Sequence, residues 1–113
     1  MERITVDLVP NFTKPVECHA SQNDNGRQIE VKLTNAGEPY HLTETDTVQL
    51  RVKTSGGDSI TQEVVNTHDD FVTITATRDM TATSGLNACV LKLTNATRRA
   101  STSIFYMRIE PKP

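Results

Sequence analysis

Period-two alternation of apolar and polar residues is the feature that most constrains the fold of this chain. Ile29, Val31 and Leu33 alternate with charged residues, and residues 48–53 repeat the pattern. Such alternation places one row of side chains on a core and the other row in water. The pattern predicts half-buried strands, and no bound ligand is needed to explain it.

Eight strands are predicted, and they are separated by short polar turns. They are residues 4–8, 16–21, 27–34, 47–53, 59–65, 71–76, 86–93 and 100–109. Asn-Gly tolerates positive φ angles, so residues 23–26 predict a hairpin between the second and third strands. Residues 78–84 are expected to hold a polar connection with at most one helical turn. The fold class predicted is all-β: an antiparallel two-sheet β-sandwich of immunoglobulin-like architecture with about eight strands.

The length of 113 residues fits a single domain. We expect one β-sandwich domain over residues 1–110, followed by the start of a proline-rich linker at residues 111–113. The chain is then one module of a longer protein.

Charge and hydropathy exclude two classes of partner. The formal net charge is −2, so the strongly basic field that nucleic acid requires is absent, and Arg98-Arg99 is interpreted as a polar hairpin turn. The first residues lack the apolar core of a signal peptide, and no stretch is long enough to span a membrane. We therefore expect synthesis in a reducing cytosol and no membrane partner.

No set of residues predicts catalysis, a metal or a cofactor. His68, Asp69 and Asp70 are metal-ligand types, but three adjacent loop residues cannot all point at one ion, and a solvated loop is the favoured interpretation. The remaining histidines, His19 and His41, stand alone. Phosphate-binding glycine loops and nucleophile elbows are also missing. The prediction is a non-enzyme without cofactor, with no catalytic, cofactor-binding or metal residues and with binding residues unknown.

The two cysteines, Cys18 and Cys89, could form a disulfide bond or remain as two thiols. They lie on an early and a late predicted strand, as in an immunoglobulin domain, and residues 85–89 have the frame of that family's corner motif. Asn87 stands in place of the corner tyrosine, however, and the chain has no Trp. We favour two separate buried thiols, which burial would make inert.

The last two predicted strands are apolar on both faces. Leu86, Ala88 and Val90 share one face of residues 86–93, opposite a second apolar row, and residues 104–107 are apolar throughout. A strand of this kind is central in its sheet, or covered by a partner, or buried under a loop or the chain's own N-terminus.

The order of these segments resembles a known family. The similarity rests on residues 22–27 before a strand, then 34–43, 48–53 with a glycine turn, and 83–93 before the terminal strand. This order and spacing resemble the N-terminal domain of phage baseplate upper proteins, from siphophages of Gram-positive bacteria. Leu86 replaces the aromatic residue usual after the late glycine, and Arg98-Arg99 replaces an acidic or glycine-rich turn.

The resemblance implies a non-catalytic adaptor in a phage tail baseplate. Such a domain docks the upper baseplate and its receptor-binding assembly onto the tail tip, with the distal tail protein as the expected partner. Localisation in the virion follows, after synthesis in the bacterial host cytoplasm. Because the helical stem of the family is missing, this chain alone is expected to be a monomer or a weak oligomer.

Two other functions are weighed against the adaptor. A carbohydrate-binding or adhesin β-sandwich on a virion or cell surface predicts exposed aromatic residues on one face, whereas Tyr40 and Tyr106 are far apart in a chain with 4% aromatics. An enzyme is disfavoured by the missing catalytic motifs.

Overall fold

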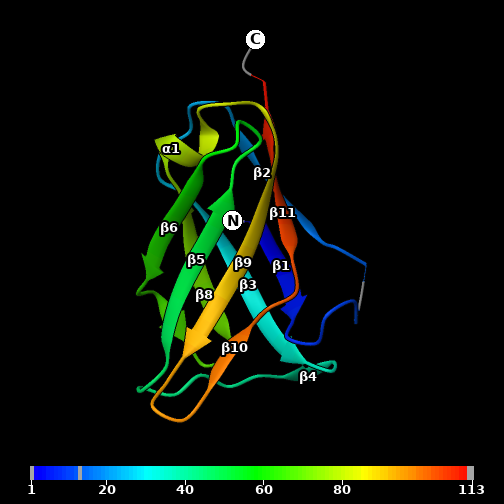
Figure 1. Ribbon diagram of the computed structural model, residues 1–113, viewed down its shortest axis with the longest axis vertical. Helices are drawn as coiled ribbons and strands as arrows, with labels where there is room; N and C mark the ends of the chain where they lie inside the picture. Colours follow the sequence, from blue (N-terminus) through cyan, green and yellow to red (C-terminus); the bar gives the residue numbers. More distant parts are fainter. Residues whose placement is uncertain (1, 13, 112–113) are drawn as a thin grey trace.

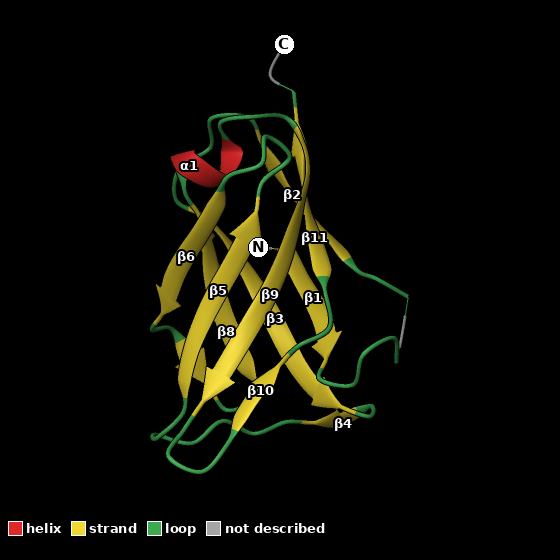
Figure 2. Ribbon diagram, in the orientation of Figure 1, coloured by secondary structure: helices red, strands yellow, loops and turns green. Residues whose placement is uncertain are grey.

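In the computed structural model, residues 2–12 and 14–111 are described, and they form two facing sheets and one short helix (Figures 1 and 2). The β3 sheet contains β1 (Glu2–Asp7), β3 (Arg27–Asn35), β4 (Glu38–Pro39), β7 (Thr67–His68) and β8 (Phe71–Ala76). The β9 sheet contains β2 (Glu17–Ser21), β5 (Thr47–Lys53), β6 (Ser59–Val64), β9 (Gly85–Thr94), β10 (Arg99–Ser101) and β11 (Phe105–Glu110). The predicted all-β, two-sheet sandwich is confirmed.

Strand order places β9 at the middle of its sheet. The β9 sheet runs β2-β11-β9-β5-β6 with β10 also on β9, and the β3 sheet runs β1-β3-β8-β7 with β4 on β3. The described strands number eleven instead of about eight, since β4 and β7 are two-residue strands and the last predicted strand is divided. At the division, the Thr102 amide donates to the Leu91 carbonyl (3.0 Å), while the Leu91 amide donates to the Thr102 hydroxyl (3.1 Å). A side chain thus replaces a backbone acceptor there.

Two pairs of strands are parallel, so both sheets are mixed and not purely antiparallel. β1 runs parallel to β3 with Ile4 opposite Val31, and β2 runs parallel to β11 with Cys18 opposite Met107. Parallel neighbours require a crossover connection. β2 supplies it by crossing to the β9 sheet between β1 and β3.

The predicted hairpin at residues 23–26 is therefore wrong. Its strands, β2 and β3, lie in different sheets. The local turn chemistry is nevertheless present, since Asn23 (φ 69°) and Gly26 (φ 98°) both have positive φ. The turn bends the chain from one sheet to the other, because β2 finds its hydrogen-bonding partner in β11, far along the sequence.

The core lies between the two sheets and is built by the alternating rows. Ile29, Val31 and Leu33 are fully buried in β3, and Leu50 is fully buried in β5. Burial of each such side chain contributes about 1.5–3 kcal/mol to folding before entropy is counted. The two-residue period of the sequence thus accounts directly for the inner faces.

A buried amide fastens one end of the sandwich. Helix α1 (Arg78–Thr81) lies at the end where β5 turns into β6 (Figure 1). The side chain of Asn87 is fully buried; its Nδ2 donates to the Met80 carbonyl (2.7 Å) and its Oδ1 accepts from the Ser55 amide (3.1 Å). Asn87 therefore ties the helix and the β5–β6 turn to β9.

Side chains also bridge both open sides of the sandwich. Glu2 of β1 accepts hydrogen bonds from the His19 backbone amide (2.7 Å) and pairs with His19 Nδ1 (2.8 Å) on edge strand β2. On the other side, Gln62 of β6 donates to the Thr75 carbonyl (3.0 Å) and accepts from the Thr75 amide (3.2 Å) of β8. Backbone groups satisfied in this way are not available to pair with an added strand.

Candidate functional site

The residues of metal-ligand type do not converge. Asp69 turns towards His41, with Oδ1 2.5 Å from Nδ1, whereas Asp70 is buried with Oδ2 4.0 Å from Lys32 Nζ. His68 belongs to β7. Within residues 2–12 and 14–111, no three His, Cys, Asp or Glu side chains gather as a metal site would require.

No pattern in the sequence predicts the contact between His41 and Asp69, which are 28 residues apart. Both side chains are more than half exposed. An exposed pair in water lacks the desolvation that makes a His–Asp pair a catalytic base, so this contact is a surface hydrogen bond without a catalytic role.

Both cysteines are free thiols, as favoured from the sequence. They lie in one sheet, Cys18 on β2 and Cys89 on β9, with β11 between them. Two strand spacings are about 9.5 Å, beyond the reach of a disulfide. Burial raises the pKa of Cys18 to about 12 and also raises that of Cys89, so neither is a nucleophile at neutral pH.

The outward row of the β9 sheet is the candidate surface. We call it the outer face; its apolar members are Leu86, Ala88, Val90, Ile104 and Tyr106. Ile104 is 50% exposed and Leu86 40% exposed, while Ala88, Val90 and Tyr106 are half-buried. β9 is thus central, which is one of the alternatives that its two apolar faces left open, and no loop of the described chain buries its outward row fully.

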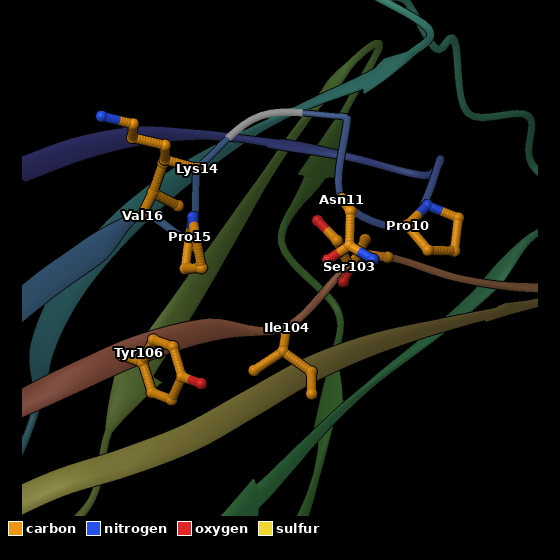
Figure 3. A pocket seen from close by; sticks show the side chains of 9 residues that line it. Pro10, Asn11, Lys14, Pro15, Val16, Ser103, Ile104 and Tyr106 are labelled. Carbon is orange, nitrogen blue, oxygen red and sulfur yellow. The ribbon is translucent and has the colours of Figure 1, made fainter.

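A groove opens beside the division between β10 and β11. Its cavity of about 400 Å³ lies between the β1–β2 loop and the segment leading into β11 (Figure 3). Pro10 and Asn11 stand at one end near Ser103, Lys14 and Val16 lie on the loop side, and Ile104 and Tyr106 extend from the opposite segment.

Backbone hydrogen bonds fix the walls of this groove. The Ser103 amide donates to the Asp7 carbonyl (2.8 Å), and the Tyr106 amide donates to the Val16 carbonyl (2.9 Å). The groove is therefore anchored to β1 on one side and to the start of β2 on the other. A preformed wall loses little entropy when a partner binds.

The hollow continues across the outer face. Ile104 also lines a second cavity of about 350 Å³ with Ala88, Val90 and the cations Arg51 and Lys92. Arg51 and Lys92 reach a third hollow of the same volume, which Arg99 completes. These cavities form one shallow, mixed apolar and basic surface, and such a surface suits a protein partner better than a small molecule.

The two tyrosines do not form a platform. Tyr40 is only 9% exposed, and its ring lies 5.1 Å from the Arg98 guanidinium, which also donates to the tyrosine hydroxyl. Arg98 and Asn95 close the β9–β10 turn, as predicted for a polar hairpin (Asn95 amide to Arg98 carbonyl, 2.9 Å). Tyr106 alone of the two tyrosines lines the groove.

Comparison with known proteins gives a likeness in structure. Neither a family model nor a curated protein sequence matches the chain. Among solved structures, the N-terminal domain of phage TP901-1 ORF48 superposes with a TM-score of 0.71 at 16% sequence identity, over 96% of this chain and 97% of that domain. This chain is therefore similar in fold, from end to end, to the N-terminal domain of a phage protein.

Proposed function

We propose that this chain is a non-catalytic structural module of a phage tail baseplate. In this proposal it docks the upper baseplate and its receptor-binding assembly onto the tail tip, through the distal tail protein. The observation that carries the proposal is the end-to-end likeness in fold to a domain of a phage protein. The resemblance of the sequence to baseplate upper proteins supports the same role.

The outer face supplies the contact surface for this role. It offers half-exposed Ile104 and Leu86 beside hollows of 350–400 Å³, whereas side chains already occupy backbone groups of His19 and Thr75 at the two open sides of the sandwich. We propose docking by this face instead of by an added strand.

The proposal includes the organisation of the protein. Residues 1–110 act as the docking domain, and a proline-rich linker begins at Pro111, while residues 112–113 lie outside the described part of the chain. The domain is a monomer or weak oligomer by itself. It is made in the host cytoplasm and is incorporated into the virion tail.

Labelling of virions tests this role. Antibodies against the purified domain, applied to intact phage and viewed by electron microscopy, are expected to decorate the tail tip. Label on the capsid, or virions that contain none of the protein by immunoblot, would overturn the proposal.

A second candidate function is a carbohydrate-binding module. The groove places Tyr106 beside the polar side chains of Asn11 and Ser103, a combination able to hold a sugar ring. A single tyrosine is a small platform, since Tyr40 is buried. Binding to host cell-wall glycans that is lost in Tyr106→Ala would favour this candidate over the adaptor.

A further inference from the structure

We propose that the outer face recognises an acidic, partly apolar segment of a partner tail protein. The inference rests on the proposed docking function and assigns the chemistry of its partner. Four cations carry it, and we call them the basic cluster: Arg51 and Lys53 on β5, Lys92 on β9 and Arg99 on β10.

Strand register brings the basic cluster together. Gln49 is opposite Lys92 and Arg51 is opposite Val90, so Arg51 and Lys92 are diagonal neighbours on one face. Arg99 is opposite Thr94, which is the next outward-facing residue after Lys92 on β9. Cations from three strands, up to 48 residues apart in sequence, thus line two adjoining hollows: Arg51 and Lys92 reach both, Lys53 reaches one and Arg99 the other.

The basic cluster is not neutralised within the described chain. Ion pairs form elsewhere, at Arg3, Arg27, Lys32 and Arg108, and the carboxylate contacts of His19 and His41 also lie outside the cluster. Within residues 2–12 and 14–111, no ion pair engages a member of the cluster. Arg51 donates to Gln49 Oε1 (3.3 Å), and Gln49 donates to Glu63 Oε1 (2.6 Å). The Glu63 carboxylate at the edge of the cluster is therefore linked to Arg51 only through the neutral amide of Gln49.

This local charge opposes the charge of the whole protein. The chain has 12 Lys and Arg against 14 Asp and Glu, so the excess of cations on this face leaves the remaining surface distinctly acidic. Neighbouring cations repel each other, and a partner carboxylate would relieve that repulsion while gaining charge-assisted hydrogen bonds.

The apolar centre selects the kind of partner. Val90 and Ile104 lie between the basic cluster and the groove. Phosphate backbones gain nothing from burying aliphatic side chains, and sites for single-stranded nucleic acid combine cations with aromatic platforms instead. A protein segment with both carboxylates and apolar side chains satisfies both halves of the face.

Calorimetric titration with two ligands tests the inference. One ligand is the distal tail protein of the same phage, and the other is a synthetic peptide that alternates Glu with Val. The variants are Lys92→Glu and Arg78→Glu, which change the net charge equally at exposed positions. Lys92→Glu is expected to weaken binding of both ligands about tenfold. Arg78→Glu is expected to leave it unchanged, and added salt is expected to weaken binding by the wild type.

The outcomes separate the inference from the proposed function. Docking of the tail protein that is equally strong in both variants and insensitive to salt would overturn the inference and leave the adaptor role intact. Binding of the peptide alone would support the basic cluster and count against the adaptor. A Lys92-dependent dimer in light scattering, or equal affinity for a DNA oligonucleotide, would overturn the acidic-segment assignment.

Discussion

Asp7 and Thr34 form a buried hydrogen bond, with the Thr34 hydroxyl donating to Asp7 Oδ2 at 2.6 Å. The same carboxylate accepts from the backbone amides of Val9 (2.7 Å), Ala36 (3.0 Å) and Gly37 (2.9 Å). Asp7 therefore ends β1, fastens it to its parallel neighbour β3 and closes the turn into β4. The Asp7 carbonyl, in turn, holds Ser103 at the groove.

Asp7 predicts a loss of stability in acid. Burial alone would raise its pKa, but the hydrogen bonds from Thr34, Gly37, Val9 and Ala36 outweigh burial and lower the pKa below 3.8. The unfolded chain then binds more protons than the folded chain below about pH 4, so stability falls as the pH drops through the lowered pKa. Denaturant unfolding from pH 7 to pH 2 should show this slope, and Asp7→Asn should reduce it.

At pH 7, Asp7→Ala should cost about 2–3 kcal/mol, since it leaves one buried hydroxyl and three part-buried amides without their acceptor. The matched control is Asp79→Ala, at an exposed position of α1, which should change the free energy of unfolding by less than about 0.5 kcal/mol. Equal effects of the two substitutions would contradict the structural role given to Asp7.

Gly85 predicts a steric requirement at the start of β9. Its φ is +126°, and an added Cβ would lie 2.9 Å from Ser55 Cβ. Gly57→Ala is the matched control, because Gly57 also has a positive φ of +96° but nothing within 4 Å of an added Cβ. Gly57→Ala should cost about 1 kcal/mol from strain alone.

Gly85→Ala should cost about 1–3 kcal/mol more than that control, because the clash involves the side chain that begins the β5–β6 turn. Thermal and urea unfolding of both variants measures the difference. A Gly85→Ala protein as stable as Gly57→Ala would show that Ser55 moves without cost.

The two thiols are predicted to be unreactive in the native state. Because burial keeps both protonated, a thiol-specific chromogenic reagent should react with neither at pH 8, and with both after denaturation. Above about pH 9 the unfolded chain releases these protons before the folded chain does, so stability should fall by about 1 kcal/mol per pH unit for each thiol. Cys18→Ala/Cys89→Ala should lack this part of the alkaline slope. A native mass showing an intramolecular disulfide would contradict the assignment.

Most of the strands could be predicted from the sequence, because the pattern that defines each strand is local. The strand at residues 47–53 appears unchanged as β5 and that at 71–76 as β8, since alternation alone defines them. Which strands pair is a long-range choice. The turn at residues 23–26 has the right local chemistry for a hairpin, yet β2 leaves it to pair with β11.

The outer face could be predicted only in part from the sequence. Two apolar rows at residues 86–93 pointed to it, but they did not distinguish a central strand from a strand under a loop. The basic cluster was hidden, because Arg51, Lys92 and Arg99 come from three strands and become neighbours only through register. The contact between His41 and Asp69 likewise depends on tertiary structure.

Size-exclusion chromatography with light scattering tests whether the chain docks by its outer face. The chain would be mixed with the distal tail protein as wild type, as Ile104→Asp and as Val65→Asp. Both positions are exposed and apolar, but Ile104 lies on the outer face, whereas Val65 lies in the link between β6 and β7 and is 88% exposed. Co-elution at a defined stoichiometry is expected for the wild type and Val65→Asp, and separate peaks are expected for Ile104→Asp. Co-elution of Ile104→Asp as complete as that of the wild type would contradict docking by the outer face.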